Sequence, residues 1–455
     1  MFFTRDRDFY KTLVRLAIPI ALQNAVTFAV NFADNLMVGT LGDSAISGVY
    51  VGNQLQTVLQ MFVAGIEGAI LILAAQYWGK RDTGSIRKIA SIGVRFAVLV
   101  GVLITLVAFL FPSQIMRIFT SDASVIEMGT PYVRVVSLSY LFFCISQVLI
   151  ASMRAVETAK IGLFVSCVAL IVNVSLNYVL IFGKLGFPAL GVTGAAIATL
   201  ISRIVESTVM VVYVRLIDRK LCLRFKDLLK SDRRLTRDFL RYGTPIVGGQ
   251  IVWSVNMMGQ TMILGRFDAG VIAATSIAGM LHNMMYIAMN GFSSAVGIIT
   301  GKTVGAGRID KIREYSRTTQ VIFLGIGVLS GIAVFLLRDP FINMYNASPA
   351  AVEYSRQFIN VISITIVGTC YQAACLFGLV KSGGDIAFVF KNDTIFVFLV
   401  VLPSAILASY LGAPPWVVFA CLKSDQILKC LVAVVKINRY NWMKNLTHDN
   451  TETEA

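Results

Sequence analysis

Residues 13–38, LVRLAIPIALQNAVTFAVNFADNLMV, form a long apolar run that recurs in the second half of the chain as residues 239–264, FLRYGTPIVGGQIVWSVNMMGQTMIL. Superposing Pro19 on Pro245 sets an offset of 226 residues between the two halves. The same offset pairs further residues without a gap: Gly39 with Gly265, Gly65 with Gly291, Gly79 with Gly305, and Arg87 with Arg313. The chain is therefore an internal duplication, which predicts two homologous lobes.

Composition indicates that a lipid bilayer, rather than water, is the main solvent of this chain. Of its 455 residues, 56% are hydrophobic and 14% are charged, and the mean hydropathy is +0.74. Soluble domains carry about 25% charged residues. Apolar runs of roughly 20 residues, enough to cross a bilayer as a helix, recur along the sequence. We place spans at 13–38, 49–78, 89–111, 131–153, 161–182, 191–216, 239–264, 272–300, 315–337, 356–380, 388–410 and 414–437.

These spans predict the fold class. We expect an all-α integral membrane protein of twelve transmembrane helices, in two homologous six-helix lobes around a central cleft. An even number of spans in each lobe gives both repeats the same orientation, so the pseudo-two-fold axis should lie along the membrane normal.

Positive charge is concentrated in alternate loops. The formal net charge is +15, and bases lie after the second, fourth and eighth spans: Lys80, Arg81, Arg87, Lys88, Arg154, Lys160, Lys302, Arg308, Lys311 and Arg313. The opposite loops, around Asp43, Lys184, Arg266 and Pro414, hold at most one base each. Basic loops stay in the cytoplasm. We therefore expect a multi-pass protein of the plasma membrane with both termini cytoplasmic.

The expected lobes are residues 1–215 and 239–437, and residues 438–455 form a cytoplasmic tail. Between the lobes, residues 216–238 form a basic connector, which should lie as an amphipathic helix on the anionic headgroups of the bilayer. Since membrane spans flank its bases, we expect no nucleic-acid partner. We also expect a monomer without a cofactor.

Asp34 is a carboxylate deep within the first span. An isolated charge at the bilayer centre costs about 2.5–3.5 kcal/mol on insertion scales. Asp34 should therefore bind an ion, hold a proton or accept several hydrogen bonds. Its partner in the repeat is Gln260, so the fold that the lobes share does not require this acid. We interpret Asp34 as functional; the alternative is a carboxylate that only bridges helices.

The chain resembles the multidrug and toxic compound extrusion family of cation-coupled antiporters along nearly its whole length. Four segments in the family's order carry the resemblance: NFADNLMVGTLG at 31–42, AAQYWGKRD at 74–82, NVSLNYVLIFGKLGFPALGVTGAAIAT at 173–199, and KSGGD at 381–385. The duplicated layout also fits, since two similar bundles that rock about one interface open a cavity to either side of a membrane in turn.

The resemblance implies that Asp34, Asn173, Asn177 and Thr199 form a polar cluster that binds the coupling proton or cation. Asn173 and Asn177 share a helix face because they are four residues apart. Asn177 stands where one branch of the family has an aspartate. A proton needs only the carboxyl of Asp34, whereas sodium needs several oxygen ligands, of which Asp34 would be one. Both coupling ions stay open.

Two further predictions concern the first lobe. Pro19 removes a helical hydrogen bond, and the resemblance favours a conformational hinge there over a static kink. Glu67, a second acid within a span, is matched by Ser293 in the repeat. It either attracts a cationic substrate, takes part in proton transfer, or takes part in close helix packing beside Gly65 and Gly68. Arg203 and Glu206, three residues apart, should pair along their own helix.

Other polar, aromatic and thioether side chains are candidates for the substrate cavity, with helix packing as the alternative for each. Together with Glu67 they are Gln54, Gln250, Asn256, Gln260, His282, Asn283, Tyr286 and Met289.

The second lobe has its charges late in the sequence, at Asp393, Lys423, Asp425 and Lys429. Asp425 should pair with Lys429, four residues later in the helix. Lys423 would then need either Asp393 as a partner or a water-filled cavity around its charge. The group is either a buried ion-pair network or a second polar site.

These observations predict a secondary antiporter that exports small organic, mainly cationic, compounds in exchange for protons or sodium. A glycine-rich ATP-binding loop is absent from the sequence. The alternative within transport is a lipid-linked saccharide flippase, which would favour a strongly cationic cavity. A membrane enzyme would need nucleophile or metal-ligand clusters, which two histidines do not favour. An ion channel would need a repeated filter loop.

Overall fold

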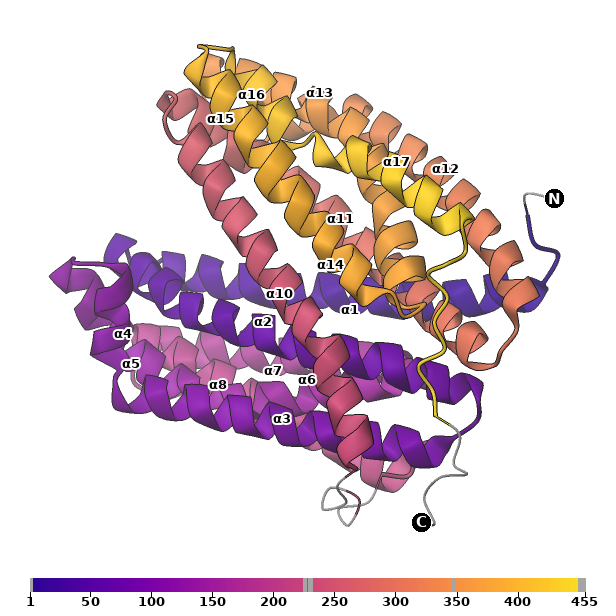
Figure 1. Ribbon diagram of the computed structural model, residues 1–455. Helices are drawn as coiled ribbons and strands as arrows, with labels where there is room; N and C mark the ends of the chain where they lie inside the picture. The colour runs from indigo at the N-terminus through magenta and orange to yellow at the C-terminus, as the bar shows by residue number, and fades with distance from the viewer. Residues whose placement is uncertain (1–2, 224–226, 228–231, 346–347, 449–455) are drawn as a thin grey trace. The chain divides into compact units, whose positions relative to one another are not determined.

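The computed structural model describes residues 3–223, 227, 232–345 and 348–448, and the regular secondary structure within them is helical (Figure 1). The first half holds α1 (Arg7–Gly39), α2 (Asp43–Gly79), α3 (Thr83–Leu110), α4 (Pro112–Phe119), α5 (Ala123–Ser137), α6 (Ser139–Ala155), α7 (Lys160–Phe182), α8 (Gly191–Val212) and the π-helical η1 (Tyr213–Ile217). The second half holds α10 (Arg233–Leu264), α11 (Ala269–Gly305), α12 (Ile309–Ile342), α13 (Pro349–Gln372), η2 (Ala373–Lys381), α14 (Ile386–Ile395), η3 (Phe396–Val401), α15 (Leu402–Tyr410), α16 (Pro415–Leu422) and α17 (Asp425–Asn438).

Each of the twelve spans expected from the sequence coincides with a helical segment. Nine helices in the described ranges are long and apolar enough to cross a membrane, and the bent pair α5–α6 makes a tenth. Two expected spans fall short of that test. In α10, Gln250, Asn256 and Gln260 lower the apolar character, and the last span is divided into the short helices α16 and α17.

Serine side chains accompany both helix breaks. At the 47° bend between α5 and α6, Ser137 donates its hydroxyl to the Arg134 carbonyl at 2.9 Å, and Ser139 donates to the Val136 carbonyl at 2.6 Å. Between α16 and α17, Ser424 donates to the Cys421 carbonyl at 2.7 Å. A hydroxyl bonded to a carbonyl of the preceding turn competes with the helical ladder and bends the helix.

Contacts divide the chain into two units, one of residues 22–247 and one of residues 1–21 with 248–455. These boundaries differ from those of the lobes expected at 1–215 and 239–437. Both observed boundaries fall inside helices. The first lies in α1, two residues after Pro19, and the second lies in α10, two residues after Pro245. Since Pro19 and Pro245 correspond in the repeat, α1 and α10 each pass from one unit into the other at matching positions.

Within the unit of residues 22–247, α7 and α8 form a tight hairpin. Gly183 ends α7 in the left-handed conformation (φ 66°), and the Leu190 amide returns to the Leu180 carbonyl at 2.9 Å. A Cβ on Gly194 would lie 2.6 Å from that carbonyl oxygen, so only glycine permits this approach. The hairpin thereby fixes the position of the α7 face that carries Asn173 and Asn177.

The structure describes residues 216–223, 227 and 232–238 of the expected connector, and they do not form the single amphipathic helix that we expected. Residues 218–223 are not helical, and residues 233–238 already belong to α10. The remaining residues of the connector lie outside the described residues. The beginning of the connector is hydrogen-bonded to the ends of neighbouring helices in the same unit. Arg87 donates from Nε to the Leu221 carbonyl at 2.5 Å, and Lys220 donates from Nζ to the Val156 carbonyl at 2.7 Å. At the other end Lys88 pairs with Asp232 at 3.0 Å. Some bases of this region therefore bind the protein itself.

In the unit of residues 1–21 and 248–455, a continuous apolar core joins α10, α11, α13 and α16. Its centre includes Phe358 and Phe419, whose rings stack with centroids 4.3 Å apart. Gly368 on α13 lies against the Gln426 carbonyl of α17, where a Cβ would collide with the oxygen. This close contact holds α17, and with it Lys429, against the rest of the unit.

The start of the chain is fastened to α12 by Asp6. Its carboxylate accepts hydrogen bonds from the Lys311 ammonium at 2.5 Å and the Tyr315 hydroxyl at 2.6 Å, and the Thr4 amide donates to the Thr318 hydroxyl at 2.8 Å. The bonds from Lys311 and Tyr315 lower the pKa of Asp6 from 3.8 to about 2.

We expect Asp6→Asn to lower thermal stability at pH 7 by about 1 kcal/mol, since the pair is partly exposed to solvent. A lowered pKa in the folded state means that the contribution is complete above the ordinary value and is lost as the pH falls towards 2. The melting temperatures of wild type and Asp6→Asn in detergent should therefore converge as the pH falls below 4. Asp8→Asn, which removes an exposed charge from the same turn, is the control. An equal difference between wild type and Asp6→Asn at pH 7 and pH 3 would contradict the assignment.

Candidate functional site

Each unit contains a cluster of polar side chains among its described residues. In the unit of residues 22–247, the Nδ2 of Asn177 donates to the Oδ1 of Asp34 and also lies 3.2 Å from the Oδ1 of Asn173. Both asparagines are buried, with exposed fractions of 0% and 1%. A carboxylate on α1 is thus joined to two stacked amides on one face of α7.

This cluster has unused hydrogen-bonding capacity. The Oδ1 of Asn177 and the Nδ2 of Asn173 are buried without a partner in the described protein, whereas buried polar atoms are nearly always bonded. The Asn177 oxygen and the two oxygens of Asp34 are hard ligands of the kind that sodium uses, so the residues fit a small cation. They equally fit a proton on Asp34, because Asn177 can donate to the carboxyl oxygen that stays unprotonated.

Arg203 gives this site its positive neighbour. Its guanidinium interacts electrostatically with Asp34, forms an ion pair with Glu206 at 2.6 Å, and lies 5.0 Å from the Phe143 ring centroid. The pairing of Arg203 with Glu206 along α8 confirms the sequence prediction. Arg203 therefore divides its attraction between Asp34 and Glu206. Thr199 lies on α8 one turn earlier, and in the described part of the chain it is not hydrogen-bonded to the cluster.

Glu67 lies on α2 and interacts electrostatically with Arg154 on α6. Arg154 is 9% exposed, and its Nη2 donates to the Oε1 of Gln23 at 2.8 Å. The sequence analysis counted Arg154 among the loop bases, which was wrong, because α6 extends to Ala155 and carries the guanidinium inside the bundle. Glu67, which is partly buried, thus has an opposite charge inside the bundle in Arg154.

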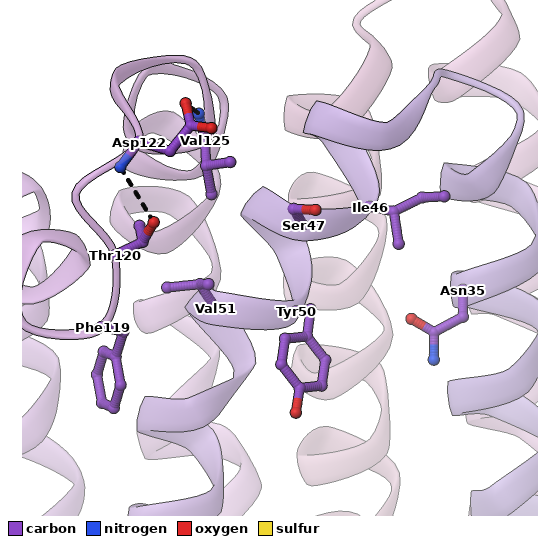
Figure 2. A pocket seen from close by; sticks show the side chains of 9 residues that line it. All are labelled: Asn35, Ile46, Ser47, Tyr50, Val51, Phe119, Thr120, Asp122 and Val125. Carbon is purple, nitrogen blue, oxygen red and sulfur yellow. Dashed lines mark hydrogen bonds between the residues drawn. The ribbon is translucent and has the colours of Figure 1, made fainter. Parts of the chain in front are cut away.

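A pocket of about 560 Å³ lies in the same unit, beside the end of α1 (Figure 2). Its lining residues are Asn35, Ile46, Ser47, Tyr50, Val51, Phe119, Thr120, Asp122 and Val125. Asp122 is already used as the N-cap of α5, where its carboxylate accepts from the Ser124 and Val125 amides at 2.9 and 3.4 Å. The sequence analysis did not predict this pocket. Asp122, before α5, was the one residue that could have pointed to it. The cavity candidate Gln54 is partly buried on α2 and does not line it.

The unit of residues 1–21 and 248–455 contains a cavity of about 280 Å³. It brings together most of the predicted second-lobe residues: Asn256, Gln260, His282, Asn283, Tyr286, Asp393, Lys423, Asp425 and Lys429. Gln250 and Met289 are not part of its lining, and Met289 instead packs into the apolar core. Trp253, Phe377 and Gln372 were missed, since nothing in the sequence distinguishes them from packing residues.

Lys429, rather than Lys423, pairs with the acids of this cavity. Lys429 contacts both acids, Asp425 at 3.0 Å and Asp393 at 2.9 Å. The first contact confirms the predicted pair. Because Asp393 is bonded to Lys429, it does not pair with Lys423. Lys423 instead donates a hydrogen bond to the Oε1 of Gln260 at 3.1 Å. The break between α16 and α17 explains the change, because Lys423 and Lys429 do not lie on one continuous helix.

Comparison with known proteins follows the same duplication. The family model MatE matches residues 19–179 and 245–411, and the two matches begin at Pro19 and Pro245. A probable multidrug resistance protein NorM of Thermotoga maritima is 27% identical over 355 residues, 78% of this chain and 76% of that protein. The probable multidrug resistance protein NorM of Listeria innocua is 22% identical over 451 residues, 98% of each chain.

Solved transporter structures share the fold. The Vibrio cholerae MATE transporter VcmN in its bent form matches with a TM-score of 0.86 at 16% identity, over 95% of this chain and 97% of that one. The eukaryotic MATE transporter AtDTX14 matches with a TM-score of 0.82 at 19% identity, over 96% of this chain and 97% of that one. Because the MatE model covers both halves at the offset of the internal repeat, this all-helical, multi-pass membrane protein belongs to the MATE family of multidrug efflux transporters.

Proposed function

We propose that this protein is a cation-coupled antiporter that exports small organic compounds, and that Asp34 is the residue at which the coupling ion binds. The observation that carries the proposal is the hydrogen-bonded series Asp34–Asn177–Asn173, which has a buried oxygen still without a partner. The corresponding position in the repeat is Gln260, so the acid is a specific feature of one unit.

Neutralising Asp34 would rearrange its surroundings. With Asp34 ionised, Arg203 is attracted by two acids, Asp34 and Glu206. A proton or a sodium ion on Asp34 cancels one of these attractions and leaves Arg203 to Glu206. Since α1, α7 and α8 all carry members of this group, ion binding changes the contacts among three helices, as a coupled transporter requires.

Pro19 is the proposed hinge of this change. It lies in α1, fifteen residues before Asp34, and lacks the amide that would bond to the preceding turn. The boundary between the two units falls two residues later. A change of contacts at Asp34 can therefore be transmitted along α1 to a point where its helical ladder is already weakened.

The transporter acts, in this proposal, as a monomer in the plasma membrane with both termini cytoplasmic. The basic loops support this orientation, because Lys80, Arg81, Lys302 and Arg308 lie at the same ends of α2 and α11 in the two repeats.

We expect Asp34→Asn to abolish gradient-driven export, because the amide neither takes up a proton nor supplies a charge for sodium. The measurement is drug accumulation in proteoliposomes under an imposed proton gradient or sodium gradient, applied separately. Glu127→Gln, which removes an exposed acid from α5 of the same unit, should leave export unchanged. Wild-type export by correctly folded Asp34→Asn protein would disprove the role proposed for Asp34.

Protons are the coupling ion that we favour over sodium, because the cluster has a single carboxylate. Asn177→Asp adds a second acid to the cluster and should increase the dependence of export on sodium, since two carboxylates compensate better for the hydration that the ion loses. We expect the sodium concentration for half-maximal export to fall at least several-fold, measured in the same liposomes at constant pH. Asn177→Ser, which removes the amide without adding charge, is the control. If wild-type export already followed a sodium gradient and ignored a proton gradient, the preference for protons would be wrong while the site could stand.

A further inference from the structure

We propose that the cavity of the unit formed by residues 1–21 and 248–455 binds the carboxylate group of a small ring-bearing substrate, and that Lys423 is the residue that recognises it. The inference rests on the proposed export function and names a class of compound that it handles.

Lys423 is the cation of this cavity that lacks a directly bonded acid. Asp393 and Asp425 both bind Lys429, at 2.9 and 3.0 Å, whereas Lys423 donates a hydrogen bond to the neutral amide of Gln260 at 3.1 Å. Asp425 attracts Lys423 only electrostatically. An ammonium within a membrane span is costly unless an anion or water compensates it. Lys423 therefore has two remaining donor hydrogens and a charge to offer to a ligand.

The repeat emphasises the difference between the two sites. Gln260 occupies the position that corresponds to Asp34, and in this unit it accepts a hydrogen bond from a lysine. The position that holds an anion in one unit thus holds a neutral acceptor beside a cation in the other. A ligand that suits Lys423 must have the opposite sign from one that suits Asp34.

The walls of the cavity indicate the rest of the ligand. Trp253, Tyr286, Phe377 and Phe419 all line it, and Phe419 also lies 5.6 Å from the Lys423 ammonium. Phe419 is held in place by its stacking on Phe358 at 4.3 Å. Aromatic walls favour a flat or ring-bearing body, and a volume of about 280 Å³ admits only a small one.

Two other occupants fit less well. An organic cation would have to compete with Lys429 for Asp393 and Asp425, which already share that lysine. A lone halide would satisfy Lys423 but would leave the aromatic walls without a contact. A carboxylate attached to a ring satisfies the lysine and the walls together.

The test is equilibrium binding to the full-length protein in detergent, measured by titration calorimetry with 3-phenylpropionate and with its uncharged amide, 3-phenylpropionamide. These probes have nearly the same shape and differ in charge. Wild type should bind the acid at least ten times more tightly than the amide. Lys423→Gln should abolish that preference, and Lys423→Arg should retain most of it. Lys391→Gln, an exposed lysine of α14, should leave it unchanged.

Gln260→Glu provides an independent test that keeps Lys423 in place. The new carboxylate should neutralise the ammonium and abolish the preference for the acid, as Lys423→Gln does. Equal binding of both probes by wild type would overturn the proposal, as would an unchanged preference in folded Gln260→Glu or Lys423→Gln protein. Complete displacement of the acid by equimolar chloride would also overturn it, because the site would then recognise only a simple anion.

The outcome can be separated from that of the export proposal, since the binding measurement uses no ion gradient. Equal binding of the acid and the amide by wild type, with intact coupling through Asp34, would refute only the carboxylate site. Acid binding in a protein that exports nothing under either gradient would refute only the coupling.

Discussion

Every charge within the spans of this protein has to find a partner inside the protein, because the bilayer supplies none. This constraint governs both polar sites. Asp34 is bonded to an amide, Arg154 to a glutamine, and Lys429 to two aspartates. Except for the bond between Lys429 and Asp425, which both lie on α17, these contacts join different helices, so they also hold the bundles together. Removing one member would leave another charge buried and uncompensated, which is more costly than removing both.

The internal repeat separates what the fold needs from what the function needs. The prolines of α1 and α10, and the glycines that pair across the repeat, are shared by the two halves. The polar side chains are not: Asp34 corresponds to Gln260, and Glu67 corresponds to Ser293. Ser293 donates to the Ala373 carbonyl at the start of η2, and thus serves helix packing in a place where the other half has an acid. Two similar backbones thereby carry sites of different electrostatic character.

Much of the fold was predictable from the sequence, because apolar runs of bilayer length and their repetition are properties of the chain alone. Each expected span coincides with a helical segment. The helix breaks were not predicted, since Ser137, Ser139 and Ser424 resemble any other serine until their hydroxyls are seen to bond the backbone. That failure had a consequence at the candidate site. Treating the last span as one straight helix gave the correct pair Asp425–Lys429 but left Lys423 to either Asp393 or a cavity; Asp393 bonds to Lys429 instead, and Lys423 lines a cavity. The candidate residues of the second unit were largely found, whereas Trp253 and Phe377 were missed, because an apolar ring has the same appearance in a core and in a cavity wall.

The passage of α1 and α10 between the two units affects the order in which the protein can be assembled during synthesis. Residues 3–21 are synthesised before residues 22–247, yet their unit is completed only when residues 248–448 have been made. The unit of residues 22–247, by contrast, is complete once the first turns of α10 have been made. Residues 3–21 can therefore contact the α12 residues that bind Asp6 only after more than half of the sequence has been synthesised. A ribosome that stalls just beyond residue 247 would leave the unit of residues 22–247 complete, while residues 3–21 would still lack the rest of their unit.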